Sequence, residues 1–507
     1  GPGTYAAEVP ARLEGAVSRR VHAIPAPSPR PRRFVTHGLV AAIVLGAVLA
    51  WGGEPVPDDL PATGGPLRVG PDGRSFTGSD GEPFFWLADT AWSLFTDLSR
   101  SEAQIYLDAR AEQGFTVIRT AALVGRAGGS GANQYGDRPL TLGRPDVTEG
   151  AGAGEVEYDY WDHVDFVVGE AARRGLVVGL RPVWGDVEEP LTADRADALG
   201  RFLAERYGEA PVVWMLDGSA ADVGDGWPAL AAGERLDVQL LDGRRGAACR
   251  HEGTSREVIG TAYGSGRPFV DGEPVLEGEV LCREGKGYAT PLDVRRDAYG
   301  AVFGGAAGHT YGHRAVAQFA TALPGGRSRW TLALQAPGAV QMRHLRALVE
   351  SRPRLAPDAG RLVGSGPIQA ALAPDGSTAM AYTPTGQAID LDLDALSGNL
   401  AQPWWYDPRT GKANALEPVP STGTVRFSVP GAGSEQDWVL VVDDVDASRG
   451  APGEPADHDG FDLRSAPEGL FGAAGHDLDD PSGAEPGAAQ SAPSPPPDTL
   501  TGDERAR

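Results

Sequence analysis

The sequence predicts an α/β protein in which a (β/α)8 barrel of the TIM type precedes an antiparallel β-sandwich. Apolar runs alternate with helix-like stretches from 66 to 355, which is typical of right-handed βαβ units and a parallel sheet. From 362 to 443 the apolar residues instead recur at every second position, which indicates a small sandwich. An open doubly wound sheet is the alternative for the first domain, but no glycine-rich phosphate loop follows its first strand.

The stretch before the barrel predicts a membrane-inserted segment. A basic cluster that ends at Arg33 precedes the apolar run Gly38–Trp51, which reaches a marginal membrane span when 34–37 are added. Basic residues before this run and acidic residues after it indicate a cytoplasmic N-terminus. Residues 34–51 are therefore either an uncleaved single-pass anchor, with the barrel on the extracellular side of the cell membrane, or a cleaved signal peptide, with the barrel secreted.

Composition sets the remaining boundaries. We expect a disordered segment at 1–33, a Pro/Gly linker at 52–65 and a disordered acidic tail at 446–507.

The net charge of −24 argues against nucleic acid, or an anionic membrane surface, as the main partner. Cys249 and Cys282 can form one disulfide in an exported protein or remain two thiols. No Cys or His spacing indicates zinc, so neither a metal nor a cofactor is expected.

Individual barrel elements follow from apolar runs and helix boundary residues. Ser99 is a candidate N-cap and Gly114 a stop, which together define a helix over Ser101–Gln113. The other expected helices are Asp159–Arg174, Thr192–Tyr207, Val294–Val302 and Ala339–Ser351. The expected strands are Phe84–Asp89, Phe115–Thr120, Leu176–Val183, Val212–Leu216 and Phe269–Val270, after a hairpin at 67–76. Between 220 and 265 the pattern weakens, and only Val258–Tyr263 resembles a strand.

The second domain is expected to contain short strands separated by turns. They are Ile368–Leu372, Thr378–Tyr382, Ala388–Leu393, Thr424–Val429 and Trp438–Val442. The aromatic run Trp404-Trp405-Tyr406 is either a ligand platform or core, and core is favoured because a sandwich needs large buried side chains.

One short stretch carries the strongest chemical signal. The apolar pair Phe269-Val270 runs directly into Asp271-Gly272-Glu273, so a buried strand delivers a carboxylate at its tip. Chemistry in a parallel barrel lies at such strand ends. Glu273 is therefore the candidate for the central catalytic residue, and a solvated glutamate in an ordinary turn is the alternative.

Several motifs in a fixed order resemble those of a known family. They are Pro66–Val69, Phe85–Trp92, Gly114–Ile118, Asn133–Asp137, Trp184–Asp186, Asp271–Pro274, Asp293–Arg296, Gly305–His313 and, in the second domain, Trp404–Gly411. With these motifs the chain resembles the apiosidase-like glycoside hydrolases, a (β/α)8 barrel followed by a β-sandwich of the collagen-binding type. The resemblance covers about 66–443, with a gap at roughly 220–265.

The resemblance implies a retaining mechanism with two carboxylates, which such enzymes hold about 5–5.5 Å apart. Glu273 matches the family's nucleophile. The position that matches the acid/base aspartate holds Ser219, whose hydroxyl is too weak an acid to protonate a leaving oxygen. Asp217 lies two residues earlier and is the nearest replacement, with helix capping or a turn as its alternative role.

The family motifs also imply substrate-binding side chains. Sugars stack on aromatic faces and bond to carboxylates, so the pocket is expected to include Asp89, Trp92, Trp184 and Asp186, together with Asn133, Tyr135 and Tyr311 from the matching motifs. Packing at the barrel mouth is the alternative role for the tryptophans. His309 and His313 are expected to hydrogen-bond near the substrate rather than to bind a metal, because they lie on an irregular glycine-flanked segment.

Two hypotheses about function follow. The first is an exported glycoside hydrolase that acts on polysaccharide side chains by the retaining mechanism. The second is a catalytically inactive, surface-displayed carbohydrate-binding protein, because Ser219 replaces the expected acid. In both cases the partner is a carbohydrate, and membrane contact is expected only through the N-terminal segment. The sequence does not indicate the oligomeric state.

Overall fold

The structure is a computed structural model of the chain. It describes residues 67–125, 131–147, 159–185, 192–216, 227, 230, 239–241, 256–272, 275–281, 287–319, 330–358, 360–364, 366–431, 433 and 435–454. Both ends of the chain, the apolar run Gly38–Trp51 and the two cysteines lie outside these ranges. Within them, no helix is both long and apolar enough to cross a membrane.

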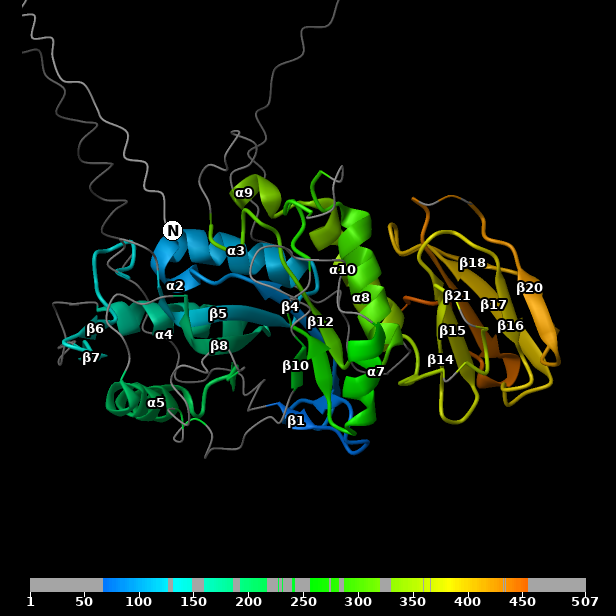
Figure 1. Ribbon diagram of the computed structural model, residues 1–507, viewed down its shortest axis with the longest axis horizontal. Coiled ribbons are helices and arrows are strands. Elements are labelled where there is room, and N and C mark those ends of the chain that lie inside the picture. Colours follow the sequence, from blue (N-terminus) through cyan, green and yellow to red (C-terminus); the bar gives the residue numbers. More distant parts are fainter. Residues whose placement is uncertain are drawn as a thin grey trace, which may run out of the picture. The chain divides into compact units, whose positions relative to one another are not determined.

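Among the described residues of the first domain, seven parallel strands form one sheet, in the order β10-β11-β12-β4-β5-β8-β9 (Figure 1). They are β4 (Trp86–Thr90), β5 (Val117–Val124), β8 (Val177–Trp184), β9 (Val212–Trp214), β10 (Gln239–Leu241), β11 (Phe269–Asp271) and β12 (Gly308–Tyr311). The last strand, β12, pairs in parallel with the first, β4, as closure of a barrel requires. Most of the chain between β9 and β10 lies outside the described residues. The predicted barrel, with its interruption in the middle, is confirmed.

Helices cover the outside of this sheet. They are α2 (Leu94–Asp97), α3 (Arg100–Glu112), α4 (Tyr160–Arg173), α5 (Ala193–Tyr207), α7 (Arg256–Gly264), α8 (Pro291–Phe303), α9 (Trp330–Ala333) and α10 (Pro337–Glu350). Figure 1 shows α8 and α10 side by side next to β12. Ser99 forms a capping box with Glu102 at the start of α3, and Thr290 forms one with Asp293 at the start of α8, so local sequence fixes where both helices begin.

One predicted strand is wrong, because Val258–Tyr263 lies within α7. Its β-branched residues favour a strand, but its buried residues have helical spacing. Ile259 and Ala262, three positions apart, pack in one cluster with Phe269 of β11. Burial of this helical face overrides the local strand propensity.

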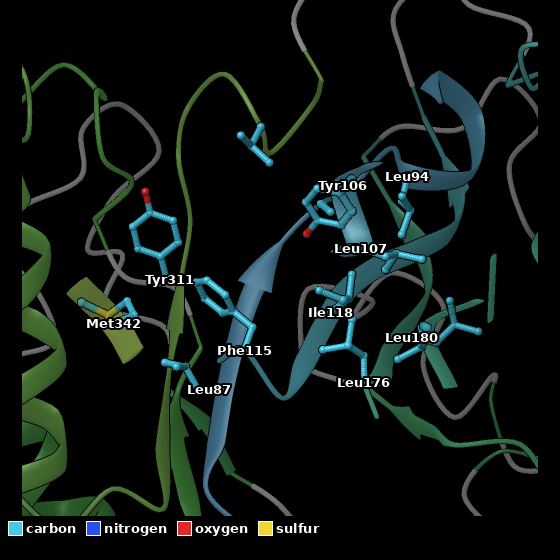
Figure 2. Close-up of a cluster of buried hydrophobic side chains, with 14 of the residues drawn as sticks. Leu87, Leu94, Tyr106, Leu107, Phe115, Ile118, Leu176, Leu180, Tyr311 and Met342 are labelled. Atoms are coloured by element: carbon cyan, nitrogen blue, oxygen red, sulfur yellow. The ribbon is translucent and has the colours of Figure 1, made fainter. Parts of the chain in front are cut away.

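The parallel sheet has a hydrophobic core on each of its two faces. Trp86 and Ala88 of β4 pack inside the barrel with Val117 and Val270. The intervening Leu87 faces the helices and belongs to a larger outer core, part of which Figure 2 shows. Successive side chains of a strand point to opposite faces, so position along each strand determines whether a residue can reach the barrel interior.

Two small antiparallel sheets flank the barrel. The first, which contains the predicted hairpin, consists of β1 (Arg68–Val69), β2 (Phe76–Thr77) and β3 (Pro83–Phe84). Phe76 packs against Trp86 in the inner core, with ring centroids 6.1 Å apart. The second sheet pairs β6 (Leu140–Thr141) with β7 (Arg144–Pro145).

The second domain is antiparallel, as predicted. Its larger sheet contains β13 (Ala356–Pro357), β14 (Gln369–Leu372), β15 (Thr378–Thr383), β21 (Trp438–Asp444), β17 (Leu400–Tyr406), β18 (Ala413–Ala415) and β19 (Val419–Pro420), and a second sheet pairs β16 (Ile389–Asp392) with β20 (Thr424–Phe427). The short 3-10 helix η2 (Val445–Ala447) follows β21. Trp405 packs in the core of this domain, which agrees with the interpretation of the aromatic run as core.

Barrel helices and sandwich strands share one buried seam. Arg295 of α8 donates two hydrogen bonds to Asp437, at 2.7 and 2.9 Å, and Arg352 donates to Asp443 at 2.8 and 2.9 Å. The rings of Tyr299 and Tyr382 stack at 5.1 Å. These contacts, which we call the seam, make α8 and α10 part of a core common to both domains.

Candidate active site

Both candidate carboxylates follow strands that end at one edge of the barrel. Asp217 comes shortly after β9, and Glu273 comes directly after β11. The carboxyl ends of parallel strands meet at the same edge, which is where the chemistry of such barrels lies. Asp217, Ser219 and Glu273 themselves lie outside the described residues.

The residues on either side of Glu273 are held by side chains from other elements. Arg119 of β5 donates through Nη1 to the carbonyl oxygen of Gly272. The amide of Val275 donates to Asp297 Oδ2 at 3.2 Å. The backbone that enters and leaves the 273–274 segment is therefore fixed on both sides.

A pair of stacked tryptophans lies at the same edge. The rings of Trp92 and Trp184 are 5.4 Å apart and within 9° of parallel. Trp92 is 3 % exposed, whereas Trp184 is half-buried and keeps part of its indole accessible. Leu276, three residues after Glu273, packs in the same cluster. The structure thus brings two predicted site residues together beside the Glu273 loop, and we call them the tryptophan pair.

Two buried arginines flank this pair. The guanidinium of Arg119 lies 4.2 Å from the Trp92 ring centroid, and that of Arg181 lies 5.6 Å from it. Sequence analysis missed both residues. Each is a cation within an otherwise apolar strand, which the sequence alone shows. Arg119 is also two residues from the inward-facing Val117, so its side chain is expected on the same face.

Asp89 faces the helices and not the barrel interior. Its Oδ2 accepts hydrogen bonds from Tyr106 Oη and Arg110 Nε, both at 2.7 Å, and the side chain is fully buried. Burial raises the pKa of this carboxyl, and the charge of Arg110 and the hydrogen bond of Tyr106 oppose that shift. In this position Asp89 ties β4 to α3.

His309 also points into the helix layer. Val270 packs inside the barrel, so its neighbour Asp271 points outward, and Asp271 is paired in register with His309 of β12. The Nδ1 atom of His309 lies 3.2 Å from Asp271 Oδ2, and both side chains are fully buried. This contact joins β11, the strand that precedes Glu273, to β12 on the helix-facing side of the sheet.

Tyr311 is the third outward-facing residue. Figure 2 shows it in the outer core near Phe115 and Leu87. Its hydroxyl donates to Glu277 Oε2 at 2.6 Å, and Glu277 Oε1 accepts from the amide of Gly338 at 3.3 Å, near the start of α10. Burial raises the pKa of Glu277. Tyr311 therefore anchors the loop that follows Glu273 at a helix N-terminus, where a carboxylate is stabilised.

His313 lies on that same loop system. It forms a parallel β-bridge with Glu277, and its Nδ1 accepts a hydrogen bond from the amide of Ala315 at 3.0 Å. Burial, with the nearby charge of Arg110, lowers the pKa of His313 to about 4. The imidazole is therefore neutral at physiological pH, with its proton on Nε2.

Asn133 and Tyr135 belong to a loop that packs on α3 and α4. Asn133 is 6 % exposed, and its side-chain oxygen accepts from the amides of Tyr135 and Asp137 at 2.9 and 3.0 Å. The Tyr135 hydroxyl accepts from the amide of Arg100 at 2.9 Å. No described contact joins this loop to the tryptophan pair. Asp186 lies outside the described residues.

The arrangement suits sugar chemistry. An aromatic face and two guanidinium groups meet at one barrel edge, and one of those guanidinium groups binds the carbonyl of Gly272. No group of three or more metal-ligating side chains is found among the described residues.

Comparisons with known proteins identify the family. The model of the apiosidase-like catalytic domain matches residues 71–237 and 229–356, together more than half of the 507 residues. The chain belongs to the apiosidase-like family. The model described as "Putative collagen-binding domain of a collagenase" matches residues 364–443. The two matched segments of the catalytic domain overlap at 229–237, within the stretch of about 220–265 that carries no family motif.

Solved structures agree with this assignment. A glycoside hydrolase is 28 % identical, with a TM-score of 0.66, and the alignment covers 75 % of this chain and 97 % of that one. A glycoside hydrolase of family 5 from Bacteroides vulgatus ATCC 8482 is 26 % identical, with a TM-score of 0.68 and coverage of 77 % and 96 %. Among curated proteins, no significant match is found. The fold and family of this chain are therefore those of glycoside hydrolases.

Proposed function

We propose that this protein hydrolyses glycosidic bonds in polysaccharide side chains by a retaining mechanism. Glu273 attacks the anomeric carbon, and Asp217 protonates the leaving oxygen and later activates water. The observation that carries this proposal is Arg119, which lies on the Trp92 ring and binds the carbonyl of Gly272, the residue before Glu273. That contact supports a single site formed by the aromatic platform and the candidate nucleophile.

The substrate class follows from the family. Because the family is named for apiosidases, apiosides and pectic side-chain oligosaccharides are the first compounds to assay, with aryl glycosides as activated analogues. We expect the wild-type protein to release the sugar with retention of its anomeric configuration. Glu273→Gln removes the nucleophile and is expected to abolish turnover while oligosaccharide binding persists. Full activity of Glu273→Gln would remove this residue from the mechanism.

Asp217 is tested through its dependence on the leaving group. Asp217→Asn should lower kcat on oligosaccharides about 10²- to 10⁴-fold, the usual contribution of general acid–base catalysis. The loss of kcat/KM, which reports the glycosylation step, should be much smaller on aryl glycosides, whose leaving groups need little protonation, while kcat still falls because the same residue activates water in the second step. An equal loss of kcat/KM on both substrates would argue against Asp217 as the acid.

A carbohydrate-binding protein without catalytic activity is the second candidate, because Ser219 occupies the position expected of the acid. It predicts saturable glycan binding with no turnover, even in the Ser219→Asp variant. Turnover by the unmodified protein excludes it.

The proposal places the barrel outside the cell. The basic cluster through Arg33, the apolar run Gly38–Trp51 and the acidic residues after it support an uncleaved anchor at 34–51. Fractionation followed by N-terminal sequencing tests this. A soluble secreted species that starts near Trp51 would overturn the anchor, and a soluble cytoplasmic species that retains Arg19 would overturn export.

A further inference from the structure

The loop that carries Glu273 is held from both faces of the sheet. Inside the barrel, Arg119 binds the carbonyl of Gly272. On the helix side, Asp297 of α8 accepts the amide of Val275 at 3.2 Å. Only residues 273 and 274 separate these two contacts in the sequence, so the chain is held immediately before and immediately after them.

Asp297 is well placed to fix this loop. It lies in the middle of α8, which begins at a capping box between Thr290 and Asp293. Two residues before it, Arg295 binds Asp437 of the sandwich and Gln341 of α10, the latter at 2.6 Å. The helix is therefore anchored at its start and on its outer side, and its carboxylate presents a fixed acceptor to the loop.

The surroundings of Asp297 favour its protonated form, and the hydrogen bond to Val275 does not require a charged carboxylate. Burial raises the pKa of Asp297 well above its usual range, the charges of Asp271 on β11 and Asp293 on α8 raise it further, and the hydrogen bond from the Val275 amide opposes the shift. Asp271 in turn contacts His309 of β12. A protonated carboxyl still accepts a hydrogen bond through its carbonyl oxygen, and so does an asparagine amide.

We propose that Asp297 is a positioning residue that orients Glu273 through its hydrogen bond to the Val275 amide. This inference rests on the proposed role of Glu273 as nucleophile. Because Asp297 holds the backbone of the loop through the Val275 amide, its expected effect is on the geometry of attack and not on substrate affinity. A displacement of about 1 Å at a reacting group can lower the rate about 100-fold.

The test compares three variants. Asp297→Ala removes the acceptor and should lower kcat about 10- to 100-fold, with KM changed less than about twofold. Asp297→Asn keeps an acceptor of the same size and should retain at least about half of the wild-type kcat. Asp293→Ala removes the capping box of the same helix, so it should lower Tm while kcat of the folded protein stays near wild type.

Hydrogen exchange gives a readout that does not need activity. The amide of Val275, followed by mass spectrometry on a peptide that spans 272–281, should exchange at least about tenfold faster in Asp297→Ala, since about 1.4 kcal/mol of protection corresponds to a factor of ten. In Asp297→Asn it should exchange at the wild-type rate. If the wild-type protein cleaves no glycoside, the proposed function fails, and exchange still decides whether Asp297 holds the loop. Unchanged exchange in Asp297→Ala, or an equal loss of kcat in Asp297→Ala and Asp297→Asn, would overturn the positioning role.

Discussion

The seam and the barrel mouth both bury arginines, but they surround them differently. At the seam, Arg295 donates two hydrogen bonds to Asp437 and Arg352 donates three to Asp443, and all four side chains are nearly inaccessible. At the mouth, Arg119 binds a backbone carbonyl and lies on an indole ring. The seam pairs each charge with a carboxylate inside the fold, whereas at the mouth the Arg119 guanidinium contacts an indole ring and a backbone carbonyl.

This difference predicts where substitutions act. A side chain at the seam should affect the free energy of unfolding, because its partner would be left buried with an uncompensated charge. A side chain at the mouth should affect turnover more than stability. The following predictions test this contrast, starting with the largest expected effect.

Loss of one seam aspartate should be severe. Asp437→Ala leaves the Arg295 guanidinium buried without its carboxylate, and it also removes the acceptor of the Tyr382 hydroxyl. We expect the free energy of unfolding to fall by about 3–5 kcal/mol, measured by urea denaturation. Asp390→Ala breaks the exposed pair with Arg426 in the same domain and should cost at most about 1 kcal/mol. If the two variants lose equal stability, the seam is no stronger than a surface ion pair.

A histidine of α10, whose backbone carbonyl accepts a hydrogen bond from Tyr406 of the sandwich, should make stability depend on pH. Burial, with the nearby charge of Arg343, lowers the pKa of His344 to about 4, from a usual value of 6.5. The unfolded state therefore binds this proton first as the pH falls. The stability associated with neutral His344 is fully present above pH 6.5 and is lost as the pH falls toward 4.

His344→Gln removes that titration. Between pH 6.5 and 4.5, the free energy of unfolding of the variant should fall less steeply than that of the wild type, by up to about 1.4 kcal/mol per pH unit. Asp89, Glu277 and Asp297, whose pKa values burial raises, act in the opposite direction in both proteins. The difference between the two slopes therefore isolates His344. Parallel slopes from urea denaturation at several pH values would show that His344 does not titrate as described.

Much of the fold was predictable because its signals are local. The cap at Ser99, the turn glycines and the change from helical spacing to period two determine most helices and sandwich strands. The errors occur where tertiary contacts decide. Val258–Tyr263 is helical because Ile259 and Ala262 pack on Phe269, and β10 is only three residues long and pairs with β11.

The site was predictable only in part, for a different reason. Strand β4 is buried on both faces, so its sequence has no polar–apolar alternation to show which side chains face the interior. Trp92 and Trp184 lie together at the mouth, whereas Asp89, which the sequence assigned to the pocket, faces Arg110 in the helix layer. That pairing joins residues on two different elements, and no local pattern reveals it.

At the mouth, the tryptophan pair should contribute far less to stability than the seam does. Trp184 is half-buried, so Trp184→Ala should cost only about 0.5–1.5 kcal/mol of stability, the usual value of a stacked aromatic pair. If its accessible face stacks on the sugar, kcat/KM for glycosides should fall about tenfold, which corresponds to about 1.4 kcal/mol. Trp184→Phe keeps an aromatic face and should recover most of that loss. A large fall in Tm with unchanged kcat/KM would show that Trp184 belongs with the seam, as packing, and that the mouth does not bind sugar through this ring.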